Sequence, residues 1–272
     1  MNHEGATGRA AIGGPVVESD STASRAEWRH LRRWNAALAA LHGGQAVLIA
    51  ALSNGFSLPI TISFMTGPPG TASVTNSIYD LPIGPMVSVF LLLAAIDHGL
   101  MAAPRIHRWY ERNLARERNP ARWWEYSLSA SLMIVLIAMY TGIADLAALI
   151  AIFGVNVAMI LFGLAMEYAN RPGAPVVWRP YVYGCLAGAV PWIAIAVQIT
   201  YAQAQTGSVP GFVFGIFASL FVLFMSFAAN MALQYRRRGP WRDYLFGERI
   251  YLLLSLAAKS LLAWQIFFPT LT

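Results

Sequence analysis

The sequence contains little charge, since only 12% of its 272 residues are Asp, Glu, Lys or Arg, against about 25% in soluble domains. Its single cysteine, Cys185, excludes an internal disulfide and a thiolate metal cluster. Hydrophobic residues make up 57% of the chain, which excludes a disordered chain and an ordinary soluble enzyme. The composition predicts a protein that crosses a membrane several times.

Seven apolar stretches are each long enough to cross about 30 Å of hydrocarbon as a helix. They cover residues 34–55, 81–104, 123–144, 146–169, 178–203, 209–235 and 250–269. Each must be helical, because lipid offers the backbone no hydrogen bonds. The sequence therefore predicts an all-α seven-transmembrane-helix bundle at residues 30–272, preceded by a flexible cytoplasmic tail at residues 1–29.

Arginines occupy every second connector between these spans. They precede the first span and follow the second, fourth and sixth, whereas the other connectors and the C-terminus contain none. Because cytoplasmic loops are enriched in basic residues, the pattern predicts a cytoplasmic N-terminus and an extracellular C-terminus in the cell membrane. The net charge of +6 is thereby explained by membrane topology, and no nucleic-acid partner is expected.

Two connectors are predicted to have structure of their own. Apolar and polar residues alternate within 57–79 around a Gly-Pro-Pro-Gly break, which predicts a β-hairpin on the outer surface. An isolated hairpin is marginally stable, so we expect it to pack on another surface, such as a second subunit. The charged segment 105–121 is typical of a helix at the inner interface. Asp80 and Asp145 are expected to cap helices at their outer ends.

Lys259 is the only lysine in the chain and lies inside the last apolar stretch. Its position after Arg249 places its Cα about 15 Å into the span. An intramembrane charge costs at least about 2.5–3.5 kcal/mol, and burial disfavours the charged form of an amine. A neutral buried amine suits Schiff-base formation with an aldehyde. The alternative is a structural ion pair with a carboxylate.

Glu125, at the start of the third span, is the best candidate partner for this lysine. Ser129 shares the helix face of Glu125, and Ser255 shares that of Lys259, because each pair is four residues apart. Side chains tilt towards the helix N-terminus and both spans start on the same side, so Lys259 is expected to reach towards Glu125. The alternative is an interfacial pair between Glu125 and the nearby Arg122.

His42 and His98 lie about 10–14 Å from the predicted cytoplasmic boundary, and Asp97 adjoins His98. They are candidates for a proton store, for metal ligands or for hydrogen-bonded core groups, although no HxxxH or HExxH spacing supports a metal site. Glu167 is expected to form an interfacial ion pair near Arg171. The outer halves of the spans contain no carboxylate or histidine, whereas a proton pump needs relay groups on both sides.

Aromatic side chains in the last three spans are suited to wall a slot for a flat conjugated ligand. They are Trp192, Phe217, Phe221, Phe224, Phe227 and Trp264. Ordinary helix packing is the alternative for each of them. Gly184 and Gly188 form a GxxxG motif, which permits a close helix contact and is a candidate dimer face.

Two segments carry a resemblance to a known family. They are Arg-Trp-Trp-Glu-Tyr-Ser-Leu-Ser-Ala-Ser at 122–131 and Ser-Leu-Ala-Ala-Lys-Ser-Leu-Leu-Ala-Trp-Gln-Ile-Phe at 255–267. Together with the seven spans and the inverted topology, they make the chain from about residue 30 to residue 269 resemble the heliorhodopsins, which are microbial-rhodopsin-like proteins. One departure is the pair Ala94 and Ala95, where a small hydroxyl residue is expected one turn before His98.

The resemblance implies that Lys259 binds all-trans retinal as a protonated Schiff base and that Glu125 is the counterion. It also implies a proton-accepting polar cavity at His42 and His98. It further implies a homodimer in which the outer hairpin packs against the partner. The remaining retinal-binding residues are expected to be Tyr126, Ser129, Asn156, Met159, Trp192, Phe224, Ser255 and Trp264.

The function implied by the resemblance is that of a non-enzymatic, light-sensing photoreceptor with a slow photocycle and a cytoplasmic signalling partner. The first alternative is a light-driven proton pump or channel, which the one-sided distribution of polar groups disfavours. The second is a seven-helix membrane hydrolase, which would need a richer metal-ligating set than His42, His98 and Asp97.

Overall fold

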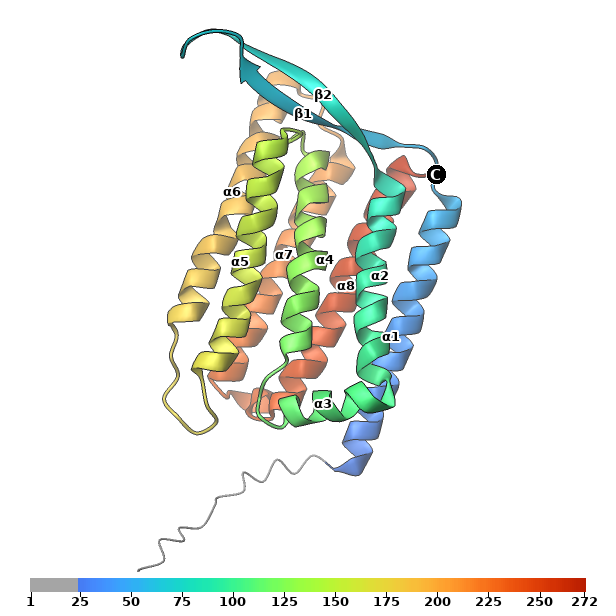
Figure 1. The fold of residues 1–272 in the computed structure, drawn as a ribbon, viewed down its shortest axis with the longest axis vertical. Helices are drawn as coiled ribbons and strands as arrows, with labels where there is room; N and C mark the ends of the chain where they lie inside the picture. The colour runs from blue at the N-terminus through green and yellow to red at the C-terminus, as the bar shows by residue number, and fades with distance from the viewer. Residues whose placement is uncertain (1–23) are drawn as a thin grey trace, which may run out of the picture.

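Seven long helices stand side by side in a computed structural model that describes residues 24–272 (Figure 1). They are α1 (Arg25–Leu52), α2 (Ile83–Ala102), α4 (Pro120–Tyr140), α5 (Leu146–Ala169), α6 (Arg179–Thr206), α7 (Gly211–Tyr235) and α8 (Tyr244–Thr270). All seven are long and apolar enough to cross a membrane, so the predicted seven-helix bundle is confirmed. Residues 1–23 of the predicted tail lie outside the described residues.

Helix α1 begins at Arg25, ahead of the predicted start of the bundle at residue 30. The reason is a capping box, in which the Ser24 hydroxyl accepts a hydrogen bond from the Glu27 backbone N–H and the Glu27 carboxylate accepts one from the Ser24 N–H. This reciprocal pairing satisfies two N–H groups of the first helical turn. The last residues of the predicted tail are therefore helical.

The two ends of the bundle differ in composition. The start of α1, the short helix α3 (Pro104–Leu114), the α5–α6 connector and the α7–α8 connector with the 3₁₀ helix η1 (Gly239–Arg242) meet at one end. We call this the basic end, because it carries the arginines of the connectors. The opposite end carries the hairpin and the C-terminus, and we call it the hairpin end (Figure 1). Helix α3 confirms the helix predicted within 105–121.

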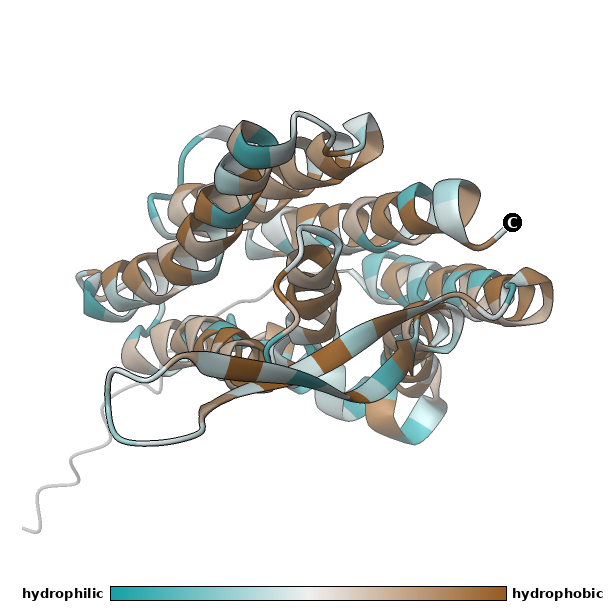
Figure 2. Ribbon diagram, turned by 90° about the horizontal axis from the view of Figure 1, so that it is seen from above, coloured by the Kyte–Doolittle hydropathy of each residue, from teal (hydrophilic) through white to brown (hydrophobic). Residues whose placement is uncertain are grey.

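Strands β1 (Ser57–Met65) and β2 (Ser73–Pro82) form the predicted antiparallel hairpin. Figure 2 shows it lying across the end of the bundle. Thr61 N–H donates to the Ala144 carbonyl at 2.9 Å, and Ser63 N–H donates to Asp145 Oδ2 at 3.3 Å. The hairpin thus packs on the α4–α5 connector of its own chain, which supplies the support that an isolated hairpin lacks.

The two aspartates expected as helix caps have different roles. Asp145 caps α5, because its carboxylate accepts hydrogen bonds from the Ala147 and Ala148 N–H groups. The expectation for Asp80 is wrong, since this residue lies within β2 and Pro82 is the N-cap of α2. The pairing of β2 with β1 continues up to the first turn of α2, which leaves no loop for Asp80 to cap from.

The GxxxG motif of α6 faces α5 within the same chain. A Cβ on Gly188 would lie 2.5 Å from Met159 Sδ, and one on Gly184 would lie 3.3 Å from Phe162 Cβ. The glycines therefore serve the close α5–α6 contact, and the motif is not a free dimer face. The lipid-facing positions of these helices are instead large and apolar, as at Leu186, which is 65% exposed.

Candidate functional site

Lys259 lies 15 residues into α8 and is buried. Its Nζ lies 3.2 Å from Glu125 Oε2 on α4 and donates to Ser255 Oγ, one turn earlier on α8, at 2.9 Å. The same Nζ lies 4.8 Å from the centre of the Tyr126 ring. The side chain thus points back towards the start of its helix, as side chains in helices do.

The carboxylate of Glu125 is committed to the lysine and not to Arg122. The Lys259 and Glu125 side chains are only 3% and 7% exposed, so water screens their attraction little. The second carboxylate oxygen, Oε1, and the Ser129 hydroxyl are buried without a partner among the described residues. The group that binds at Nζ would therefore meet unused hydrogen-bond acceptors on α4.

A cavity of about 520 Å³ opens next to Lys259, between α4, α5, α6, α7 and α8. Its wall includes six of the predicted ligand-binding residues: Tyr126, Met159, Trp192, Phe224, Ser255 and Lys259. The Trp192 ring packs edge-on to Phe217, Phe221 and Phe224 at 5.3–5.8 Å between ring centres. These rings form apolar walls that suit a flat, conjugated molecule.

The other four predicted ligand-binding residues, Glu125, Ser129, Asn156 and Trp264, lie outside this wall. Asn156 Nδ2 donates to Ser131 Oγ at 3.0 Å and joins α5 to α4. Trp264 Nε1 donates to Gln45 Oε1 at 3.0 Å and joins α8 to α1. Ser129 is buried beside Glu125 and does not line the cavity either. The polar groups of Asn156 and Trp264 hold helices together, a role that helical spacing alone could not distinguish from ligand contact.

His42 on α1 and His98 on α2 stack with ring centres 5.7 Å apart and ring planes 11° apart. Asn35, which the sequence analysis missed, places its Oδ1 2.9 Å from His98 Nδ1. It lies seven residues before His42, two turns along the same helix face, which is the signal that could have found it. Both ring nitrogens of His42 are buried without a partner among the described residues.

Several features around His42 and His98 bear on whether these residues are metal ligands, a proton store or hydrogen-bonded core groups. Among residues 24–272, no three His, Cys, Asp or Glu side chains are grouped to hold a metal ion. Asp97 forms no ion pair in the same range. Ala95, where a hydroxyl residue was expected, lies against Gly43, and a Cβ on Gly43 would meet the Ala95 Cβ at 3.7 Å. Small residues here bring α1 and α2 close together.

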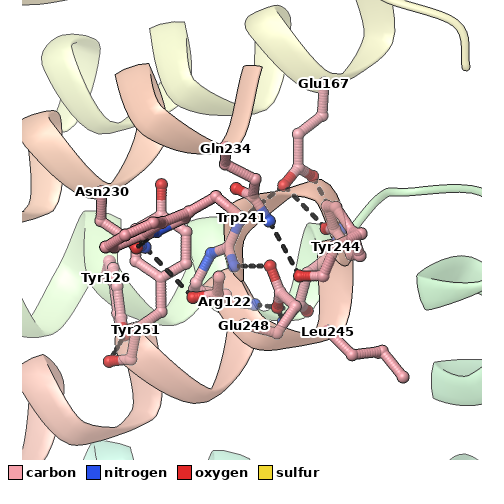
Figure 3. A network of polar contacts seen from close by, with 12 residues as sticks. Arg122, Tyr126, Glu167, Asn230, Gln234, Trp241, Tyr244, Leu245, Glu248 and Tyr251 are labelled. Atoms are coloured by element: carbon pink, nitrogen blue, oxygen red, sulfur yellow. Dashed lines mark hydrogen bonds and ion pairs between the residues drawn. The ribbon is translucent and has the colours of Figure 1, made fainter. Parts of the chain in front are cut away.

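A second buried polar cluster, shown in Figure 3, is centred on Arg122, which lies three residues before Glu125 on α4 and so nearer to the basic end. Arg122 of α4 forms ion pairs with Glu248 of α8 and with Glu167 of α5, the latter at 2.5 Å. Glu167 therefore forms an ion pair, as expected, but this pair is buried and its partner is Arg122 and not the nearby Arg171. Glu167 points inward to Arg122 because the Asn119 N–H, 2.7 Å from its Oε2, also holds it there.

Further contacts tie this Arg122 cluster to the surroundings of the lysine. The guanidinium carbon lies 3.9 Å from the centre of the Tyr251 ring, and Tyr126 OH donates to the Tyr251 carbonyl at 3.2 Å. Glu248 was absent from the sequence analysis. It lies eleven residues before Lys259 on α8, which is three helical turns and so the same face. That spacing was the available signal.

The arrangement as a whole places a buried primary amine, a buried carboxylate and an apolar slot within contact of one another. Such an amine can condense with an aldehyde, and the carboxylate can then stabilise a positive charge on the resulting nitrogen. The aromatic walls would hold the rest of a long apolar ligand. The two histidines and Asn35 form a separate polar group on α1 and α2.

Comparisons with known proteins agree with the seven-helix fold. The family model described as Heliorhodopsin matches residues 31–271. No curated protein matches the chain. Among solved structures, a light-driven proton pump from Leptosphaeria maculans is similar with a TM-score of 0.61 and 13% identity, over 90% of this chain and 95% of that chain.

A cyanorhodopsin from the cyanobacterium Tolypothrix is also similar, with a TM-score of 0.56 and 13% identity, over 89% of this chain and 92% of that chain. At these identities the two solved structures share the fold of this chain, and their activities do not transfer with it.

Proposed function

Because the chain belongs to the heliorhodopsin family and is a multi-pass, rhodopsin-type photoreceptor, we propose that Lys259 carries all-trans retinal and that light drives a slow, signalling photocycle without ion transport. The observation that carries the proposal is the buried contact of 3.2 Å between Lys259 Nζ and Glu125 Oε2 beside an apolar cavity. Family membership alone would not identify the residues that hold the chromophore.

The residues around Lys259 fit retinal. The cavity of about 520 Å³ falls within the roughly 300–1,000 Å³ that is usual for small-molecule sites. Its walls are largely aromatic and aliphatic, and the lysine amine and the Ser255 hydroxyl are among its few polar groups. Retinal, when bound, supplies an aldehyde for attachment to the amine and a conjugated chain that absorbs visible light and isomerises.

The side chains around Lys259 Nζ have different roles in this proposal. Lys259 Nζ is the attachment atom, and Ser255 Oγ fixes its direction through the hydrogen bond at 2.9 Å. Glu125 Oε2 stabilises a proton on the nitrogen, because opposite charges in a buried site attract strongly. Trp192 and Phe224 line the cavity with apolar rings, which would keep water from the linkage and protect it from hydrolysis.

We place the path of the released proton in the basic half of the bundle. His42 and His98 supply groups of the residue type that titrates near neutral pH, and His42 has unused ring nitrogens. Apart from Asp97, which adjoins His98, the described helices contain no Asp, Glu, His, Lys or Arg between the level of these residues and Lys259 and the hairpin end. Apolar helices without such groups are a barrier to protons, which supports a photoreceptor over a pump.

We further propose that the basic end faces the cytoplasm and that the protein is a homodimer in the cell membrane. The arginine-rich connectors support the orientation. Exposed apolar residues on the hairpin support a partner surface there, since Ile62, Phe64, Met65, Val74 and Ile78 are each 41–51% exposed. A protease-accessible tag at residue 5 should be protected in intact cells, and one after Thr272 should be cleaved. The reverse pattern would contradict the orientation.

Addition of all-trans retinal to the full-length protein tests the chromophore assignment. We expect a visible absorption band in the wild type and none in Lys259→Ala. Lys259→Arg is the matched control, because a guanidinium keeps a positive charge beside Glu125 but does not form the linkage. It should remain folded and colourless. A retinal-dependent visible band in either variant would show that the attachment site lies elsewhere.

Illumination of intact cells in unbuffered medium separates the photoreceptor from the pump. We expect no sustained pH change beyond that of cells that express Lys259→Ala. A sustained change that a protonophore abolishes would replace the photoreceptor proposal with a light-driven proton pump.

A further inference from the structure

A second cavity, of about 270 Å³, lies at the basic end and shares no lining residue with the Lys259 cavity. Its walls come from three connectors that are far apart in the sequence: the α3–α4 turn, the α5–α6 connector and the α7–α8 connector. Four arginines contribute to it, namely Arg171, Arg236, Arg237 and Arg242, and the only acidic residue in the wall is Glu117. We call it the arginine cavity.

The positive charge of the arginine cavity is only partly neutralised. Arg237 Nη2 binds both carboxylate oxygens of Glu117, at 2.7 and 2.8 Å. The Arg236 guanidinium lies 5.5 Å from the centre of the Trp178 ring. Arg171 and Arg242 are exposed and form no ion pair within residues 24–272. One carboxylate thus faces four guanidinium groups, and two of these, Arg171 and Arg242, contact neither a carboxylate nor an aromatic ring among the described residues.

Two of the turns that line the arginine cavity each contain a residue with an uncommon backbone conformation. Arg237 has φ 48° and Glu117 has φ 55°, and within the described range they are the only residues other than glycine with positive φ. Such residues persist only where the surrounding structure holds them. Their mutual ion pair joins the two turns, so the cavity wall is preorganised before any ligand binds.

The cavity also lies where the polar surface of a membrane is expected. Helix α7 ends at Tyr235 and α8 begins at Tyr244, and both residues line the cavity, so it borders the terminal turns of two spans. Trp178 and Trp241 lie at the same level, and tryptophan is enriched at the membrane–water boundary. Basic pockets between spanning helices at this depth bind phospholipid head groups. The planar donors of arginine match phosphate oxygens in geometry and charge.

We propose that the arginine cavity binds a phosphate group, carried by an anionic phospholipid of the adjoining leaflet or by a soluble phosphate. Arg171 and Arg242 supply the free donors, while Arg237 with Glu117 holds the wall in place. Tyr244 lines the cavity and its hydroxyl donates to Glu167 Oε1 at 3.4 Å. Ligand binding is therefore expected to stabilise the α7–α8 connector and the Arg122 cluster behind it (Figure 3).

The test uses the full-length protein and two kinds of probe. In nanodiscs of neutral phosphatidylcholine, inorganic phosphate is titrated while the unfolding temperature is measured. In a mixture of phosphatidylcholine and phosphatidylglycerol, native mass spectrometry counts the phosphatidylglycerol molecules that remain bound. The double variant Arg171→Gln/Arg242→Gln removes the two free cations. Its matched control, Arg33→Gln/Arg112→Gln, removes the same charge from exposed positions of the same end outside the cavity.

We expect the wild type and the control to bind at least one of the two probes equally well. The double variant should bind it more weakly by about tenfold or more, because two charge-assisted hydrogen bonds are lost. Binding of phosphate in the neutral discs identifies a soluble ligand, and retention of phosphatidylglycerol alone identifies a lipid. Absence of both, or an equal loss in the control, would overturn the proposal. Arg171→Lys/Arg242→Lys, which keeps the charge but not the planar donors, should bind with intermediate affinity.

Discussion

Replacement of Arg122 by glutamine should destabilise the protein severely. The Arg122 side chain is 5% exposed, and each of its partners, Glu167 and Glu248, is 2% exposed. Removal of the guanidinium leaves two carboxylates facing each other in a site that water does not reach. Removing one partner of a buried ion pair typically costs about 3–5 kcal/mol. The lost contact with the Tyr251 ring, at 3.9 Å, adds about 0.5–1 kcal/mol.

Other contacts moderate this loss. Asn119 still donates from its backbone N–H to Glu167 and from its side chain to Glu248, at 2.7 and 2.8 Å. We therefore expect the lower part of the range, about 3–4 kcal/mol. For a chain of this size each kcal/mol lowers the unfolding temperature by about 2–4 °C. The expected fall is thus roughly 6–16 °C, measured by intrinsic fluorescence during heating in one detergent.

A triple variant provides the internal control for this experiment. Arg122→Gln/Glu167→Gln/Glu248→Gln replaces the three charges by neutral amides of similar size, which can hydrogen-bond to one another. It should recover most of the lost stability, because the cost lies in the unpaired charges and not in the missing arginine itself. An unfolding temperature of Arg122→Gln within about 1 °C of the wild type, or a triple variant as unstable as the single one, would refute the reasoning.

Three further predictions concern the lysine site, the histidines and the helix contact. Glu125→Gln should shift the visible band to the red or cause its loss at a lower pH than in the wild type, because the carboxylate no longer stabilises a proton on the Lys259 nitrogen; an unchanged spectrum and pH titration would make Asp97 the counterion candidate. Replacement of both His42 and His98 by Phe should change the rate of light-induced deprotonation in flash spectroscopy while the pigment still forms; wild-type kinetics would exclude them from the proton path. Gly188→Leu should lower the unfolding temperature by several degrees, since even a Cβ there would lie 2.5 Å from Met159 Sδ and overpacking costs about 1–3 kcal/mol; the matched variant Gly154→Leu, at a position with open space, should not, and equal effects would contradict the packing argument.

The number and type of the elements could be predicted because they depend on local pattern. Helices that span lipid need long apolar runs, and the hairpin needs alternation around a Gly-Pro break, so both are visible in the sequence. The same holds for the position of Lys259 in the middle of its span. The start of α1 was missed because the capping box at Ser24 extends the helix into a polar segment, where hydropathy gives no signal.

The Lys259–Glu125 contact was predictable for a related reason. Both residues lie in spans that start at the basic end, as the arginine-rich connectors indicate. No other carboxylate in such a span lies as deep as Glu125. The residues of the cavity wall were predicted less well. Trp264 and Asn156 have the right residue type and depth, but their side chains form hydrogen bonds to other helices, at 3.0 Å each.

The sequence by itself determined the seven helices, the hairpin, the basic end and the buried lysine, because each follows from composition or from spacing within one segment. Only the tertiary structure decided which helix faces which. Arg122 meets Glu167 and Glu248 across separations of 45 and 126 residues, and helical periodicity specifies a residue's face but not the helix opposite to it. For the same reason, three connectors that look merely basic in the sequence come together as one arginine-lined cavity.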